Sequence, residues 1–292
     1  MTSASVAAVE TPAARLRRRS ARAGRGLATT GALLLGGMIL LVLAAPYVAP
    51  YDPAAQEVGP VLAGPGGDHW FGTDRFGRDV FSRVLWGGRA TLLACALAIT
   101  GVVIFGATVG ALLAGLGRRA DVAARGLLDL LIAFPSIVVA LAFVGLRGPS
   151  LATALVGVAV VLWAPFARLS RAVVRSAIAE PSAVAARAVG SGRLRLLRYE
   201  AWPRVRGPLA VLAAVEAAQL ISVVAGLSFL GLGAQPPSPE WGAMLQDGRA
   251  SLWAAPHLVI WPGVAVLVTV LGLVLLAEGL RDVLDVDSER QQ

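Results

Sequence analysis

The chain has 292 residues, of which 57% are hydrophobic and only 15% are charged, whereas a soluble domain usually carries about 25% charged residues. This surplus of apolar side chains argues against an ordinary soluble protein and predicts helices that cross a membrane. The net charge of +8 could suggest a nucleic-acid partner. The charges lie between long apolar stretches, however, so we expect a membrane protein that binds no nucleic acid.

Six uncharged stretches of the sequence are each near or above the roughly 17 to 25 residues that a helix needs to cross a bilayer core. They are Gly26–Tyr51, Ala90–Gly117, Leu130–Leu146, Gly148–Ala167, Ala217–Pro239 and Ala250–Ala277. The fifth stretch extends backwards past Glu216 to Gly207. We therefore expect an all-α membrane protein with six transmembrane helices in contact with lipid.

The N-terminal part of the chain predicts a tail followed by the first transmembrane helix. Residues 1–25 are mostly alanine, arginine and serine without apolar periodicity, so we expect a mobile cytoplasmic tail. The helix is expected over residues 26–50, where Pro46 and Pro50 end it. Arginines before an apolar run are also typical of a signal peptide, but this run is long for one, and we expect a retained helix.

Residues 51–89 are expected to form an external loop. The loop is at first rich in glycine and proline and becomes amphipathic near Arg78, where several apolar side chains could share one helix face. These are Val80, Phe81, Val84 and Leu85. We predict a helix that lies along the outer membrane surface.

Residues 90–280 are expected to form a five-helix core, followed by a cytoplasmic tail over residues 281–292. Small residues in the second transmembrane helix predict that other helices approach it closely. Its glycines are Gly101, Gly106, Gly110 and Gly115. Pro135 and Pro165 predict kinks in the third and fourth helices. The single cysteine, Cys95, can form no intrachain disulfide.

The longest inside segment runs from Arg168 to Arg206, and its loop over residues 171–206 predicts two short helices. Pro181 suits the first turn of a helix, and Gly190 to Gly192 end it. A second short helix is expected from Arg193 to Trp202 and to stop at Pro203. The two helices would form a compact projection that could enter the cleft of a partner.

The distribution of arginine predicts the orientation of the chain. If the N-terminus lies inside and the helices alternate in direction, the inside segments hold 20 of the 26 cations. The outside segments hold six, against seven acidic residues. Because positive charge accumulates on the cytoplasmic side, we expect a multi-pass protein with both termini in the cytoplasm.

Several kinds of chemistry have no matching residues in this sequence. A phosphate-binding loop needs a lysine, and the chain contains none, so any ATP must be bound by another polypeptide. His69 and His257 are the only histidines and lack neighbouring ligands for zinc. We expect no enzyme activity, no metal site and no cofactor.

Glu216 is an ionisable group within a span. We favour a structural role over an ion site. In that role the side chain hydrogen-bonds a neighbouring helix or reaches the inner interface.

Several segments resemble those of a known family. Val184–Gly190, followed thirteen residues after the glycine by Pro203, resembles the EAA loop of binding-protein-dependent ABC importer permeases. His69–Arg89 and Leu227–Leu245 resemble two hallmark segments of the second permease subunit of dipeptide, oligopeptide and nickel importers, and Gly279–Asp285 also fits.

This resemblance implies the type I ABC importer permease fold, with a coupling helix in the cytoplasmic loop. It implies a bacterial inner-membrane complex of two different permease subunits, two ATP-binding subunits and an extracytoplasmic solute-binding protein. The chain would form part of the translocation pathway and work by alternating access. Peptides are the leading substrates, with nickel or another small solute as the alternative.

The resemblance also implies the residues that would contact the ATPase. They are Ala185, Ala186, Ala188, Gly190, Arg193, Arg195 and Pro203. Val184 stands where the motif often has glutamate, and Glu200 and Trp202 replace the usual apolar pair before Pro203, which implies an ATPase groove adapted to them. An ordinary solvated basic loop is the alternative interpretation.

The external signature residues are expected either to seat the binding protein or cover the cavity, or to form a turn and a helix N-cap. They are Gly72, Thr73, Asp74, Gly77, Arg78 and Asp79. Two other classes of function stay open, an ion-coupled secondary carrier and a membrane scaffold without solute flux.

Overall fold

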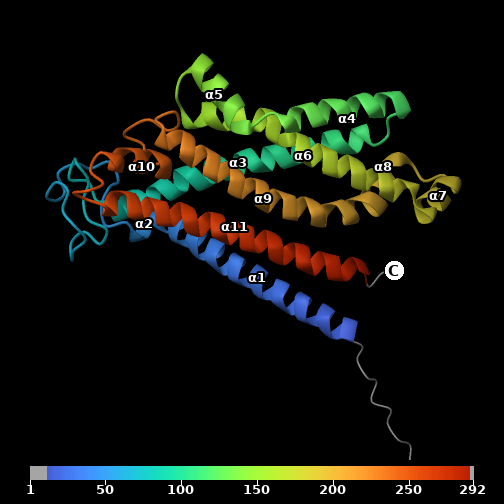
Figure 1. Cartoon of the computed structure of the whole chain (residues 1–292), viewed down its shortest axis with the longest axis horizontal. Coiled ribbons are helices and arrows are strands. Elements are labelled where there is room, and N and C mark those ends of the chain that lie inside the picture. The colour runs from blue at the N-terminus through green and yellow to red at the C-terminus, as the bar shows by residue number, and fades with distance from the viewer. Residues whose placement is uncertain (1–11, 290–292) are drawn as a thin grey trace, which may run out of the picture.

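The computed structural model describes residues 12–289, which form helices joined by loops (Figure 1). The helices are α1 (Pro12–Leu43), α2 (Ala45–Val48), α3 (Val80–Leu113), α4 (Arg118–Ala133), α5 (Ser136–Arg147), α6 (Leu151–Ala179), α7 (Pro181–Ala188), α8 (Arg193–Leu196), the π-helical turn η1 (Leu197–Ala201), α9 (Trp202–Phe229), α10 (Trp241–Arg249) and α11 (His257–Glu289). Within the described range, extended pairing is limited to an isolated bridge between Thr73 and Asp79. The predicted all-α class is confirmed.

Five helical stretches are long and apolar enough to cross a membrane. They are Gly24–Leu43, Val80–Leu113, Leu151–Ala179, Arg193–Phe229 and His257–Leu284. Helices α4 and α5 pass the same test as a pair that is bent by 76°. With this pair counted as one span, the total is the predicted six.

The bend between α4 and α5 lies at Phe134 and Pro135. A proline lacks an N–H and pushes the preceding residue into an extended conformation, and Phe134 accordingly has a ψ of 123°. The predicted kink at Pro135 is thus a break between two helices. At Pro165, in contrast, α6 continues.

Two predicted boundaries near the N-terminus differ from the structure. Helix α1 begins at Pro12, within the segment predicted to be a tail, because alanine and arginine are strong helix formers. Residues 1–11 of the predicted tail lie outside the described residues. The prediction of a separate surface helix near Arg78 is wrong, because Val80 begins α3, which runs on without interruption into the membrane-crossing part.

The predicted stop at Pro203 is also wrong. Helix α8, the turn η1 and helix α9 follow one another directly, and Pro203 lies in the first turn of α9. The Trp202 N–H bonds to the Leu197 carbonyl five residues earlier, and such a π-helical turn shifts the hydrogen-bond register where the proline N–H is missing. Because α6 extends to Ala179, the inner loop is shorter than predicted.

The long helices pack side by side in an elongated bundle (Figure 1). Helix α1 lies beside α11, α3 beside α6, and α9 between α6 and α11, while α5 lies against α6. The α1–α11 contact depends on small residues, since a Cβ atom on Gly31 would lie 2.7 Å from the Gly272 carbonyl oxygen. Fully buried side chains of α6 and α9, such as Phe166 and Leu220, fill the core.

The predicted close approach to the second transmembrane helix is confirmed at two of its glycines. A Cβ atom on Gly106 would lie 2.5 Å from the Trp163 carbonyl oxygen of α6. One on Gly110 would lie 2.8 Å from the Ser170 Cβ atom. The position of Gly101 faces open space, so the same helix also has an uncovered side.

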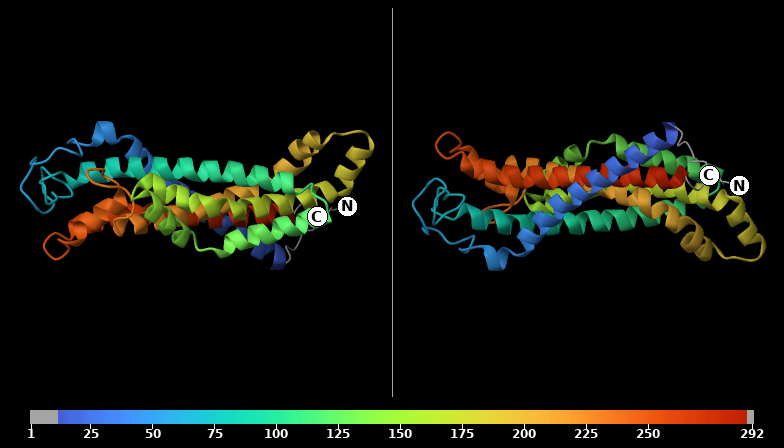
Figure 2. Two further views of the ribbon diagram at one scale, coloured as in Figure 1. Left: turned by 90° about the horizontal axis from the view of Figure 1, so that it is seen from above. Right: turned by 90° about the horizontal axis from the view of Figure 1, so that it is seen from below.

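The two ends of the bundle differ in what they carry (Figure 2). One end holds the first turn of α1, the loop between α3 and α4, helices α7 and α8, and the last turns of α11. The opposite end holds the loop after α2 and helix α10. The segments that were assigned to one side of the membrane from their arginines therefore lie at one end.

Candidate functional site

A helix–turn–helix at the arginine-rich end, which we call the inner projection (residues 180–201), extends beyond the long helices (Figure 1). Helix α7 ends in a glycine turn, in which the Gly190 N–H donates to the Arg187 carbonyl and the Ser191 N–H donates to the Ala186 carbonyl, both over 2.9 Å. Gly190 has a φ of 90°, which a residue with a side chain rarely adopts. The turn therefore requires glycine.

The base of the inner projection is tied to the bundle by polar contacts. The Arg193 guanidinium donates to the Leu112 carbonyl of α3 over 3.2 Å and lies against Gly115. Arg204 forms an ion pair of 2.7 Å with Glu180, which joins the end of α6 to the start of α9. Arg187 donates to a carbonyl of α6, that of Ile178. The projection is thus held in one orientation on α3, α6 and α9.

The tip of the inner projection exposes large apolar side chains. Val189 is 85% exposed and Leu194 is 79% exposed. Of the residues predicted to contact an ATPase, several are exposed and Ala186 is half-buried. The exposed ones are Ala185, Ala188, Gly190, Arg193, Arg195 and Pro203. Apolar side chains gathered on a projecting surface are typical of a protein interaction site.

The predicted residues do not all face the same way. Arg193 is engaged with α3, whereas the Arg195 side chain makes no hydrogen bond or ion pair with the described part of the chain. Pro203 lies beyond the projection, at the start of α9. Ala185, Ala188, Gly190 and Arg195 therefore form the exposed set at the tip, together with two apolar residues that the sequence did not single out.

A cavity of about 610 Å³ lies behind the projection. It is bounded by the inner ends of α3 and α6 on one side and by α7 and α8 on the other. Arg175, Arg187 and Arg193 line it, together with small and apolar residues such as Ala114. The projection therefore borders a cavity that is lined in part by arginine side chains.

A buried carboxylate connects α4 to α6 close to this cavity. Asp121, of which 1% is exposed, pairs with Arg125 over 2.6 Å, with Arg175 over 2.8 Å and with Arg171. Arg171 is itself buried, and its Nε atom has no partner among the described residues. Breaking a buried ion pair costs far more than breaking an exposed one, so this cluster holds the two helices together.

At the opposite end, the external signature forms a turn and a helix cap. The Asp74 carboxylate accepts hydrogen bonds from the backbone N–H groups of Phe76 over 2.8 Å and Arg78 over 3.0 Å. The Asp79 carboxylate caps α3 by accepting from the Ser82 N–H over 2.8 Å. Positive φ angles of 79° at Gly72 and 67° at Gly77 complete the turn. The predicted turn and helix N-cap therefore describe the geometry of these residues.

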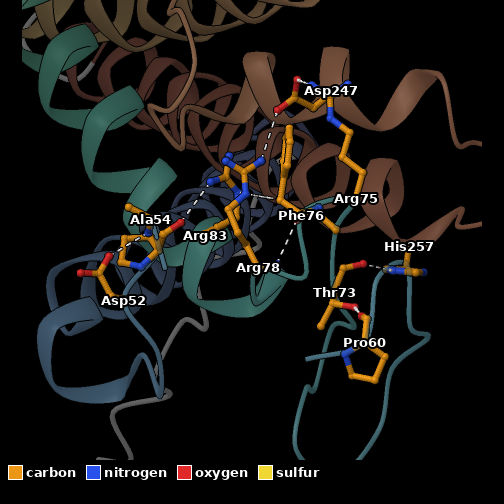
Figure 3. A network of polar contacts seen from close by, with 12 residues as sticks. Asp52, Ala54, Pro60, Thr73, Arg75, Phe76, Arg78, Arg83, Asp247 and His257 are labelled. Carbon is orange, nitrogen blue, oxygen red and sulfur yellow. Dashed lines mark hydrogen bonds and ion pairs between the residues drawn. The ribbon is translucent and has the colours of Figure 1, made fainter. Parts of the chain in front are cut away.

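Further polar contacts attach this turn to α10 and α11 (Figure 3). Arg75 lies 3.2 Å from Asp247 of α10, and the Arg78 guanidinium lies between Asp74 at 2.6 Å and Asp247 at 3.7 Å. The His257 ring of α11 is 3.3 Å from the Thr73 carbonyl oxygen. The loop after α2 is thus fastened across this end of the helices.

The two hallmark segments, which lie far apart in the sequence, contact each other. Trp241 of the second segment is fully buried and donates to the Val84 carbonyl of the first over 2.8 Å. Its ring lies where a Cβ atom on Gly88 would come within 2.7 Å. Glu240 is also fully buried, caps α10 and accepts from the Thr91 hydroxyl over 3.2 Å. The hallmarks therefore build one packed outer corner.

Some of these residues could have been found from the sequence and others could not. The Asp121–Arg125 pair has the spacing of neighbours on a helix surface, which is a local signal. Its pairing with Arg171, which is 50 residues away, depends on the packing of α4 against α6. The exposure of Val189 and Leu194 also depends on how the projection leaves the bundle.

Comparison with known proteins identifies the family. Residues 106–287 match the family described as binding-protein-dependent transport system inner membrane component. The match covers more than half of the chain. The chain belongs to this family. As a permease it is a transport component and not an enzyme, and its apolar helices make it a multi-pass membrane protein.

Individual permeases are similar along most of their length. The chain is 40% identical to the dipeptide transport system permease protein DppC of Alkalihalophilus pseudofirmus, over 89% of this chain and 85% of the relative. It is 35% identical to the probable D,D-dipeptide transport system permease protein DdpC of Escherichia coli, over 90% of this chain and 88% of the relative. It is 33% identical to the nickel transport system permease protein NikC of the same species, over 87% and 91%.

Family membership decides between several of the expectations from the sequence. The resemblance that we noted in the sequence is confirmed, and with it the type I permease fold. A binding-protein-dependent permease is favoured over the ion-coupled carrier and the scaffold that the sequence left open. The inner projection contains the segment that resembles the EAA loop.

Proposed function

We propose that this permease and a second, different permease subunit together form the translocation pathway of an ABC importer. Two separate ATP-binding subunits would drive alternating access, and an extracytoplasmic binding protein would deliver the solute. Family membership supports this assembly in general terms. The absence of lysine from the sequence supports ATP binding by other subunits and no cofactor in this one.

The inner projection is our proposed ATPase contact, and the exposure of Val189 and Leu194 is the observation that carries it. Large apolar side chains that are exposed on a projecting segment are suited to a groove of a partner protein. Ala185, Ala188, Gly190 and Arg195 share this tip. The polar ties at the base would carry motion of the tip to α3, α6 and α9.

We further propose peptides as the solute, in the inner membrane of a bacterium. The names of the dipeptide permeases, which are 40% and 35% identical to this chain, support peptides. The nickel permease, at 33% identity, supports a chelated metal as the second candidate. Both termini would lie in the cytoplasm, which the positions of the arginines and the common end of α1 and α11 support.

The test is ATP-driven uptake by the whole importer, reconstituted in vesicles with its partner permease, ATPase subunits and binding protein. We expect the vesicles to take up dialanine when ATP is supplied to the ATPase side. The Val189→Asp variant should reduce this uptake at least about tenfold, because a charge at the centre of an apolar contact must lose its water.

The matched control is Val61→Asp, because Val61 is also exposed, at 60%, but belongs to the loop after α2, which lies at the opposite end of the bundle. Thermal unfolding of both variants in detergent should match that of the parent chain, since neither side chain is in the core. Wild-type uptake by the Val189→Asp importer would contradict the proposed contact. Uptake of nickel instead of dialanine by the parent importer would replace the peptide assignment.

A further inference from the structure

Helix α9 carries polar side chains in the middle of the bundle. Glu216 lies halfway along the helix, and Gln219 and Ser222 follow at intervals of three residues. Residues three apart lie on the same side of a helix, so the three side chains form one polar stripe. The opposite side of the same stretch is buried, as Ile221, at 3% exposed, shows.

The polar stripe is not covered by the rest of the chain. Gln219 and Ser222 are exposed, and Glu216 is half-buried. The Ser222 hydroxyl donates to the Ala218 carbonyl of its own helix over 2.8 Å. Within the described part of the chain, the Glu216 carboxylate and the Gln219 amide have no hydrogen-bond or ion-pair partner. The predicted bond from Glu216 to a neighbouring helix is therefore absent there, because α9 turns this side away from the buried core.

The uncovered face of α11 carries a different kind of side chain from the polar stripe of α9. Its exposed residues between Ile260 and Val274 are all hydrocarbon side chains. They are Ile260, Val264, Leu267, Leu271 and Val274. Such a face is suited to lipid, where unsatisfied polar groups are costly. Ionisable and amide side chains within a membrane instead face a bundle interior or a water-filled cavity. We therefore expect the α9 stripe to contact water or solute in the assembled importer.

We propose that the α9 stripe lines the solute pathway and that the Glu216 carboxylate binds the protonated amino group of the solute in transit. This inference rests on the proposed function. A free peptide carries an ammonium group with three N–H donors, and a carboxylate is the complementary acceptor. Gln219 and Ser222 would hydrogen-bond the neutral amide that follows. The substrate class is accordingly solutes with a free amino group.

The first experiment tests whether the polar stripe is accessible to water. Gln219→Cys and Ser222→Cys would each be placed in the whole importer and treated with a charged, membrane-impermeant thiol reagent. The native Cys95 is 3% exposed and gives little background. Leu267→Cys, at a position 63% exposed on the α11 face, is the matched control. We expect labelling at 219 and 222 and none at 267. Protection of 219 and 222 with and without ATP would show that the stripe packs against the partner permease, and would overturn the proposal.

The second experiment tests the charge. We expect Glu216→Gln to raise the KM for dialanine uptake about tenfold, since a hydrogen bond to a charged group contributes roughly that much binding. Glu278→Gln, which alters an exposed acid near the inner end of α11, should leave the KM unchanged. An unchanged KM for Glu216→Gln would overturn this inference and leave the proposed function standing. If the parent importer itself moves no dialanine, the proposed function fails. If Glu216→Gln does not assemble, the labelling experiment decides.

Discussion

At the scale of single residues, the outer corner depends on a glycine that has no room for a side chain. A Cβ atom on Gly87 would meet the Pro239 carbonyl oxygen and would lie 3.2 Å from Cδ1 of Trp241. Trp241 is fully buried, and its indole N–H donates a hydrogen bond to the Val84 carbonyl. A shift of the loop before α10 would therefore break this hydrogen bond.

We therefore expect Gly87→Ala to destabilise the chain by about 1 to 3 kcal/mol, the usual range for overpacking a well-packed site. The measurement is the thermal unfolding midpoint of the purified chain in detergent. Gly101→Ala is the control on the same helix, since a Cβ atom there meets nothing within 4 Å. Alanine is the better helix former, so this control should leave stability unchanged or slightly raised. Equal midpoints for the two variants would refute the close packing at Gly87.

At the scale of elements, α4 has two carboxylates that pair with α6 in different surroundings. Asp121 is buried among three arginines, whereas Asp129 is 58% exposed and pairs with Arg168 over 3.3 Å. Removing the charge of Asp121 would leave Arg171 buried without its counter-ion. Removing the charge of Asp129 would leave Arg168 in contact with water.

We expect Asp121→Asn to lower the unfolding midpoint by several degrees and Asp129→Asn to change it by no more than about one degree. Both variants remove one negative charge from the same helix, so net charge is matched. Circular dichroism during heating measures both. If the two variants unfolded together, the buried cluster would not be what joins α4 to α6.

The elements that could be predicted from the sequence are those with local causes. The apolar stretches predict the spans, and the Gly190 turn follows from a residue that tolerates a positive φ. The start of α9 could not be predicted in this way, because Pro203 is a stop signal unless a π-helical turn precedes it. The surface helix near Arg78 was a similar error, since amphipathicity alone does not reveal that the helix continues as α3.

The candidate sites show the same limit. The inner projection was located from its glycines and arginines, but Arg193 and Arg195, two residues apart, have different surroundings. Arg193 bonds to α3, which depends on where the end of α3 lies in space. The polar stripe of α9 contains Glu216, which the sequence marks only as an isolated ionisable residue within a span. That this half-buried residue shares an uncovered face with Gln219 and Ser222 depends on the packing of α9 between α6 and α11.

At the scale of the whole molecule, the sidedness of the chain can be tested directly, because both ends of the bundle offer exposed positions. Leu194 is 79% exposed on the inner projection, and Trp253 is 99% exposed in the loop between α10 and α11 at the opposite end (Figure 2). The native Cys95 is buried, so the parent chain serves as an unlabelled blank.

We expect an impermeant thiol reagent to label Trp253→Cys in intact cells and to label Leu194→Cys only after the inner membrane is opened, because the positive-inside rule predicts that the arginine-rich end lies in the cytoplasm. Co-expression of the ATPase subunits should then protect Leu194→Cys and leave Trp253→Cys unchanged, since a docked partner covers only the inner projection. Labelling of Leu194→Cys in intact cells would invert the topology, and it would also remove the projection from the reach of any cytoplasmic ATPase.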